Sequence, residues 1–280
     1  MASPGNARPR LDTPLDRARL EERGVRVVDQ TTSTNEDVAA LARRGASPGL
    51  VIVTEHQTAG RGRLARPWET PARTALTFSL LLRPAVPASA WPWLPLLTGL
   101  AVTDVLTAAG FPARLKWPND VMIDDRKVAG ILLELVDGGV GGPAAVAGIG
   151  LNVRLPADLL PTETATSLLV EAQRAGLGVP RRTDLLLDVL DALGSRLERW
   201  EAAGGAVQTL REAYLPVCVT IGRRVRVTLP VGDPLVGVAA DIDESGRLVV
   251  HPDAVGPGDV EPVAVAAGDV VHVRPAPEGS

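Results

Sequence analysis

The sequence predicts an α+β fold, in which a mixed β-sheet packed with helices precedes a small all-β domain. Up to about residue 215, apolar β-branched runs alternate with segments of helical apolar spacing. After Pro216, short valine-rich runs separated by Gly, Pro and Asp are typical of a β-barrel or half-sandwich. The 280 residues, 45% of them hydrophobic, allow one large domain or two unequal ones. We therefore expect domains at residues 16–215 and 216–275.

The elements of the first domain follow from local patterns. Residues 1–15 are rich in Pro, Arg and Asp, and we expect them to be disordered. Helix-capping side chains at residues 31–36 predict a helix that ends at Gly45. Further helices are expected at residues 88–109, 183–200 and 207–214. Strands are expected at residues 25–28, 50–54, 74–82, 114–116, 121–123, 128–135 and 145–153.

Three connections and the second domain complete the prediction. Residues 56–69 form a loop rich in Gly and Arg, and residues 138–142 a flexible turn. Asp124-Asp125-Arg126 is expected to be the turn of a hairpin. The second domain has expected strands at residues 225–227, 235–240, 248–250, 263–265 and 270–273.

Composition and charge exclude several classes of protein. A net charge of −4 argues against a general nucleic-acid surface, although a local cationic pocket remains compatible with it. The N-terminal residues contain no apolar signal-peptide region, and prolines interrupt the apolar stretch at residues 91–109. We therefore expect a cytoplasmic protein without a membrane partner. The single cysteine, Cys218, excludes an internal disulfide and is expected to be a buried thiol.

The two lysines of the chain stand close together, at Lys116 and Lys127. Lysine and arginine together number 29, so the sequence otherwise uses arginine for its cations. Lysine offers a compact point charge that arginine cannot replace. A chance placement is the plain alternative, but the shared neighbourhood of Trp, Asn, Asp and Gly favours a functional site.

Two polar segments upstream supply groups suited to an anionic or polar ligand. In the segment Gly60-Arg61-Gly62-Arg63, glycines let the backbone approach a ligand and arginines offer forked donors. A solvated turn is the alternative for that loop. Ser33-Thr34-Asn35 presents three hydrogen-bonding side chains, of which one is expected to cap a helix. Asn152, which closes a predicted strand, is on its own more typical of a structural residue.

Taken together, these motifs resemble those of biotin–protein ligases, in the same order and at similar spacing. The matching segments are Ser33-Thr34-Asn35, Gly60-Arg61-Gly62-Arg63, Lys116-Trp117-Pro118-Asn119-Asp120, Lys127-Val128-Ala129-Gly130-Ile131-Leu132 and Gly150-Leu151-Asn152-Val153. They cover about residues 25–155, and the small β C-terminus also fits. The resemblance implies a class II synthetase-like catalytic domain followed by an SH3-like barrel. Because fewer than about 25 residues precede the catalytic region, we expect the monofunctional type, without an N-terminal DNA-binding domain.

The resemblance also implies a reaction and its participants. Biotin and ATP would give biotinyl-5′-AMP and pyrophosphate, with Mg²⁺ bound through the phosphates and its protein ligands unknown. The biotinyl group would then pass to a lysine of a biotin carboxyl carrier protein or domain, in acetyl-CoA carboxylase or a related acyl-CoA carboxylase. We expect the carrier to contact the second domain. No nucleic-acid partner is expected.

Roles are assigned by the same resemblance. The catalytic residues would be Lys127, Arg61 and Arg63. Biotin would be held by Ser33, Thr34, Asn35, Gln57, Arg61, Gly62, Arg63, Lys127 and Gly130, with Leu132 and Trp117 as an apolar wall. ATP and the adenylate would be bound by Arg63, Arg66, Trp68, Lys116, Asn119, Asp120, Lys127 and Asn152, and Trp68 would stack on adenine.

One departure and two rival functions accompany the resemblance. The family loop usually reads GRGRxGR, whereas Ala65 stands here in place of its last glycine. A lipoate–protein ligase or related acyltransferase would share fold and chemistry, but the motifs at residues 60–63 and 116–120 favour biotin. A non-catalytic biotin or nucleotide sensor acting on DNA is disfavoured by the acidic balance of the chain.

Overall fold

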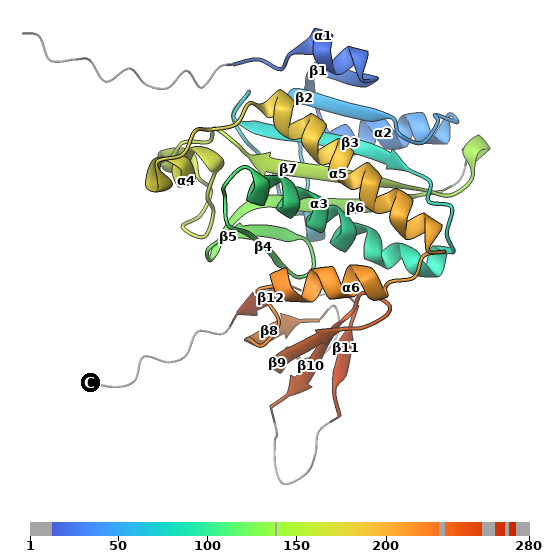
Figure 1. The fold of residues 1–280 in the computed structure, drawn as a ribbon, viewed down its shortest axis with the longest axis vertical. Helices are drawn as coiled ribbons and strands as arrows, with labels where there is room; N and C mark the ends of the chain where they lie inside the picture. Colours follow the sequence, from blue (N-terminus) through green and yellow to red (C-terminus); the bar gives the residue numbers. More distant parts are fainter. Residues whose placement is uncertain (1–12, 138, 230–232, 254–260, 267–268, 273–280) are drawn as a thin grey trace, which may run out of the picture.

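The structure, a computed structural model, describes residues 13–137, 139–229, 233–253, 261–266 and 269–272. Its larger part is a seven-stranded sheet in the order β1-β2-β3-β7-β6-β5-β4 (Figure 1). β1 and β2 are parallel, and every other neighbouring pair in this sheet is antiparallel. The strands are β1 (Val25–Thr31), β2 (Val51–Gln57), β3 (Ala75–Leu82), β4 (Ala113–Lys116), β5 (Asp120–Ile123), β6 (Arg126–Val136) and β7 (Ala144–Asn152).

Helices cover both faces of this sheet, which explains why central β3 is buried along its whole length. On one face lie α3 (Leu94–Ala108) and α5 (Arg182–Ala202), which pack against each other (Figure 1). On the other face, α2 (Thr34–Arg43) buries Val38 and Ala42 against the sheet. The oxygen of Ser33 caps α2 by accepting from the amide of Glu36, as capping chemistry predicts. α2 covers only part of its face, and the sheet beyond its N-terminus is left for a site.

The remaining short helices lie at the margins. They are α1 (Arg17–Glu22), α4 (Leu168–Ala175) and α6 (Gln208–Tyr214). The sequence did not predict α1 or α4, because α1 buries Leu20 alone and α4 has barely two turns of apolar pattern. The helix expected at residues 88–109 is 3₁₀ at Ala88–Trp93 and becomes α only from Leu94, since Pro92 and Pro95 interrupt it.

The second sheet has five antiparallel strands in the order β11-β10-β9-β8-β12. They are β8 (Arg224–Thr228), β9 (Leu235–Ile242), β10 (Leu248–Pro252), β11 (Val263–Val265) and β12 (Asp269–His272). In the described residues β11 and β12 remain the two edges, so the expected barrel is not closed there. The strand prediction is confirmed, and the boundary near residue 216 stays a prediction.

Backbone and indole contacts fix the second sheet against the first. The amide of Val219 donates to the carbonyl of Leu115, in β4, at 2.7 Å. The Trp93 indole donates to the carbonyl of Glu244 at 2.8 Å, and the Trp117 indole to that of Gly246 at 3.1 Å. Because Trp117 precedes β5, the β9–β10 turn supports a loop of the first domain.

The predictions for the N-terminal segment, for Cys218 and for membrane-spanning helices can be compared with the described residues. Residues 1–12, most of the segment expected to be disordered, and Gly138, the start of the expected turn, lie outside the described residues. Leu15, at the edge of the segment expected to be disordered, is 4% exposed and donates its amide to Glu55 at 2.7 Å. Cys218 is buried, as expected. No helix among the described residues is long and apolar enough to cross a membrane.

Candidate functional site

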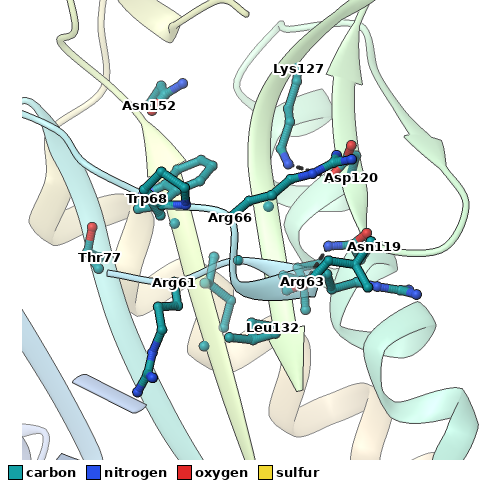
Figure 2. A pocket seen from close by; sticks show the side chains of 18 of the residues that line it. Arg61, Arg63, Arg66, Trp68, Thr77, Asn119, Asp120, Lys127, Leu132 and Asn152 are labelled. Carbon is teal, nitrogen blue, oxygen red and sulfur yellow. Dashed lines mark hydrogen bonds and ion pairs between the residues drawn. The ribbon is translucent and has the colours of Figure 1, made fainter. Parts of the chain in front are cut away.

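A cavity of about 320 Å³ lies on the face of the larger sheet that carries α2, beyond the N-terminus of that helix. Every residue that the sequence assigned to the site lines it. These residues are Ser33, Thr34, Asn35, Gln57, Arg61, Gly62, Arg63, Arg66, Trp68, Lys116, Asn119, Asp120, Lys127, Gly130 and Asn152. Leu132 and Trp117, expected as its apolar wall, also line it. Figure 2 shows Arg66 and Trp68, from the loop after β2, together with Lys127 and Leu132, from β6.

One end of the cavity is a network of polar side chains that is buried except at Glu134. The hydroxyl of Ser79 donates to Asn35 Oδ1 at 2.6 Å and lies 2.7 Å from Thr34 Oγ1. Asn35 Nδ2 donates to Glu134 Oε2 at 2.6 Å, and Gln57 Oε1 accepts from the Thr34 amide at 3.0 Å. Motif reasoning identified Thr34, Asn35 and Gln57 but missed Ser79 and Glu134, which stand inside otherwise apolar strands.

The loop of residues 58–70 forms the wall beside this network. It doubles back on itself, because Gly62 donates to the carbonyl of Arg66 at 2.7 Å and Trp68 to that of Gly60 at 2.9 Å. An added Cβ at Gly60 would lie 2.4 Å from the backbone carbonyl oxygen of Trp68, so glycine is required there. Ala65 has φ of +56°, a left-handed conformation that favours glycine and strains alanine. The structural demand on this position therefore matches the glycine usual in the family.

Arg61 does not point toward Lys127 in this structure. Its guanidinium forms an ion pair with Glu36, in the first turn of α2, and both side chains are about half exposed. In Figure 2 it extends to the opposite side from Lys127. A surface pair of this kind contributes less than about 1 kcal/mol, so a ligand anion can recruit Arg61 at little cost.

Lys127 is aimed into the cavity by an irregularity in β6. The pairing with β5 shifts between Val121 and Met122, which leaves Val128 as an extra residue. As a result Lys127 shares a side with Gly130, where an added Cβ would lie 3.1 Å from Lys127 Nζ. Lys127 Nζ lies 2.6 Å from Asp120 Oδ1 and 5.5 Å from the centre of the Trp68 ring. The ammonium is thus positioned by one carboxylate and one aromatic face.

Two glycines on β7 make room for side chains that line the cavity. Val146, Gly148, Gly150 and Asn152 alternate along the strand and so share one face. An added Cβ at Gly148 would lie 2.2 Å from Asn35 Oδ1, and one at Gly150 would lie 2.5 Å from Trp68 Cε2. Glycine inside a strand signals a close approach of this kind, so Gly148-Ile149-Gly150 could have been identified from the sequence.

The second sheet also contributes to the cavity, which the sequence did not lead us to expect. Val270 of β12 lines it. Thr220 Oγ1 accepts from the amide of Trp117 at 3.0 Å and lies 3.4 Å from His272 Nε2. Burial, with the nearby charges of Lys116 and Arg223, lowers the pKa of His272 to about 4. His272 is therefore neutral near pH 7 and adds no positive charge there.

The charge of the cavity suits a ligand with more than one anionic group. Its cationic side chains are Arg61, Arg63, Arg66, Lys116 and Lys127, and Asp120 is the acidic one among its lining residues. In a partly enclosed space these cations attract anions more strongly than on an open surface. The polar network at the other end offers neutral hydrogen-bonding groups. A molecule with a neutral polar head and an anionic partner would match both ends.

The fold and the cavity define an α+β ligand-binding protein whose site has a polar end and a cationic end. Comparison with known proteins identifies its family. The sequence profile of the Biotin/lipoate A/B protein ligase family matches residues 27–152. That of the Biotin protein ligase C terminal domain matches residues 220–273. The chain belongs to the biotin protein ligase family.

Individual members of the family and one solved structure resemble this chain over most of its length. The chain is 42% identical to the biotin–[acetyl-CoA-carboxylase] ligase of Mycobacterium tuberculosis, covering 95% of this chain and 99% of that protein. It is 33% identical to the bifunctional ligase/repressor BirA of Bacillus spizizenii, covering 80% of this chain and 68% of that protein. A biotin protein ligase from Aquifex aeolicus, solved in complex with biotin and ATP, has the same fold. It superposes with a TM-score of 0.73 at 24% identity, covering 90% of this chain and 100% of that one.

Proposed function

We propose that this protein is an ATP-dependent ligase that activates biotin as biotinyl-5′-AMP and transfers it to a lysine of a biotin carboxyl carrier protein or domain. The observation that carries the proposal is the gathering of all the predicted site residues around one cavity. The polar network beside Thr34 suits the neutral ring system of biotin. The cationic end, around Lys127, suits its carboxylate and the phosphates of ATP.

In the first step a biotin carboxylate oxygen attacks the α-phosphorus of ATP, and the bond to pyrophosphate breaks. Both reactants are anions, so the step needs fixed positive charge where they meet. Lys127 bridges the carboxylate and the α-phosphate, and Arg61 and Arg63 stabilise the same charges. Asp120 holds the Lys127 ammonium at 2.6 Å before the ligands arrive. The wall of Leu132 and Trp117 excludes water from the mixed anhydride that forms.

The nucleotide is assigned to the side of the cavity nearest β5 and the end of β7. Trp68 stacks on adenine, and Arg66 and Asn119 contact the nucleotide. Lys116 neutralises phosphate or acts in the acceptor step. Asn152 donates to the carbonyl of Thr166 at 3.0 Å, so its remaining amide oxygen is the group suited to a ligand.

Magnesium fits this donor set as a phosphate-bound ion. Mg²⁺ in such sites commonly takes one or two carboxylates, substrate phosphates and water. Among the described residues no cluster of three His, Cys, Asp or Glu side chains could hold a metal alone. Asp120 is the carboxylate placed to contribute. When bound, Mg²⁺ would neutralise charge on the phosphates.

In the second step the acceptor lysine amine attacks the acyl carbon, and AMP leaves. We propose that the acceptor is the carrier domain of an acetyl-CoA or related acyl-CoA carboxylase. The reaction is expected in the cytoplasm, where its substrates occur, and without nucleic acid.

The test is to mix the purified protein with biotin, ATP and Mg²⁺ and to measure pyrophosphate release. Mass spectrometry then follows biotinylation of a purified carrier domain. Lipoate in place of biotin is the control for the rival acyl specificity. Release with lipoate but not biotin would contradict the proposal, as would biotin-dependent DNA binding without any adenylate.

A further inference from the structure

The polar network beside Thr34 has a hydrogen-bond direction that can be assigned from its far end. Asn35 contacts Glu134 Oε2 at 2.6 Å and the carbonyl of Leu132 at 3.4 Å. A carboxylate and a carbonyl only accept hydrogen bonds, so the amide nitrogen of Asn35 must face them. Its Oδ1 then faces Ser79 and must accept.

The number of protons on each hydroxyl group fixes the direction of the next hydrogen bonds, from Ser79 to Thr34 at the cavity. Ser79 is fully buried, and its single proton is donated to Asn35 Oδ1 at 2.6 Å. Its contact with Thr34 Oγ1 at 2.7 Å therefore requires that Thr34 donate. The alternative acceptor of the Thr34 proton, Gln57 Oε1, is 3.4 Å away and competes poorly. Thr34 Oγ1 is thus left with lone pairs and no proton for a ligand.

We infer that Ser79, oriented by Asn35 and Glu134, is a positioning residue that makes Thr34 an obligatory hydrogen-bond acceptor toward the cavity. The ligand group placed against Thr34 must then be an N–H donor. Gln57 has the opposite polarity, because its Oε1 accepts from the Thr34 amide at 3.0 Å and its Nε2 keeps the donors. A cyclic urea offers the matching N–H and C=O groups. This inference rests on the proposed function and assigns how that site selects the head of biotin.

The test compares biotin with its two cyclic carbamate analogues, in which one or the other ureido N–H is replaced by oxygen. Calorimetric titration gives Kd for each ligand, and the analogue that the wild-type protein binds more weakly relative to biotin is the probe. Ser79→Ala frees the Thr34 proton to turn toward the ligand, so the preference for biotin over the probe should fall about fivefold. Glu134→Ala, at an exposed position, removes the far anchor and should act in the same direction.

A matched control and a double mutant separate positioning from packing. Thr103→Val removes a buried hydroxyl in α3 that has no hydrogen-bond partner in the described chain, and it should leave the preference unchanged. In a Thr34→Val background, Ser79→Ala should no longer alter the preference, because it acts through the Thr34 hydroxyl.

The outcomes distinguish this inference from the proposed function. If Ser79→Ala and Glu134→Ala both keep the wild-type preference for biotin over the probe, the inference is wrong, but the proposed function still stands. Equal weakening of biotin and the probe by Ser79→Ala would also overturn it, since that marks a packing role. If the wild-type protein binds neither biotin nor the carbamates, the proposed function fails and the inference fails with it.

Discussion

Gly148→Ala and Gly150→Ala should each disturb a different end of the cavity. The first should weaken binding at the polar network around Asn35, and the second should weaken binding beside Trp68. At Gly148 the new Cβ would stand 2.2 Å from Asn35 Oδ1, and at Gly150 it would stand 2.5 Å from the Trp68 ring. Contacts below 3.0 Å force a neighbour to move. Asn35 is 5% exposed and tied by hydrogen bonds, whereas Trp68 is only partly buried. The first substitution should therefore cost more stability than the second.

The magnitudes follow from these contacts. Overpacking costs about 1–3 kcal/mol, and replacing glycine by alanine in a strand restores roughly 0.5–1 kcal/mol. Gly148→Ala should thus lower the free energy of unfolding by about 1–2 kcal/mol. Displacing Asn35 should also raise the Kd for biotin about tenfold. Gly150→Ala should change stability by less than about 1 kcal/mol, but loss of base stacking on Trp68, worth about 1–3 kcal/mol, should raise the KM for ATP.

Calorimetric titration with biotin and pyrophosphate release at varied ATP measure the two effects, with denaturant unfolding for stability. Gly194→Ala is the control, because no atom lies within 4 Å of its added Cβ and it sits inside α5. It should stabilise the protein by roughly 0.5–1 kcal/mol without changing the Kd for biotin or the KM for ATP. If Gly148→Ala weakens ATP and Gly150→Ala weakens biotin, or if both leave binding intact, the assignment of the two ends is wrong.

Three further outcomes are expected. Lys127→Ala should abolish pyrophosphate release, and Lys127→Arg should restore little, because a planar fork does not replace a point charge beside Asp120; near-normal turnover of both would remove Lys127 from the mechanism. Amide exchange of residues 60–66 should slow when biotin and ATP are added, because bound anions order the loop; exchange that is slow beforehand and unchanged would contradict this. The pKa of His272 is about 4 in the folded protein against 6.5 for an unperturbed histidine, so the unfolded chain binds more protons between these values. Stability should fall as pH drops from 6.5 toward 4, and His272→Asn should remove that part of the slope in denaturant titrations.

The site was predictable from the sequence to the extent that chemistry is carried by short segments. Several site residues stand at or near the end of a helix or strand, where a polar residue type stands out from its apolar neighbours. They are Thr34, Arg61, Lys127 and Asn152. Continuous apolar and β-branched runs also predicted most strands of the larger sheet, such as β2, β3 and β7. Local sequence patterns of this kind predict the folded structure because capping and turns depend on residues that are neighbours in the chain.

What could not be predicted depends on register between distant segments. The extra residue at Val128 aims Lys127 into the cavity, yet only the pairing with β5 reveals it. Ser79 and Glu134 look like ordinary strand residues until β3 and β6 bring them to Asn35. The contact of Val270 with the cavity likewise arises only when the second sheet docks. Such features are long-range and leave no local pattern.

The hydrogen bonds from the Trp93 and Trp117 indoles to the β9–β10 turn have a consequence for protein engineering. Cutting the chain near residue 216 would remove the Thr220 hydroxyl, the Gly246 carbonyl and the Val270 side chain together. Trp117 would then lose both acceptors of its N–H groups, and the loop leading to Asn119 would lose its support. A chimaera that alters the surface of the second sheet should therefore exchange exposed residues on its strands. It should retain the host turn from Glu244 to Gly246, so that the graft stays compatible with the cavity it helps to build.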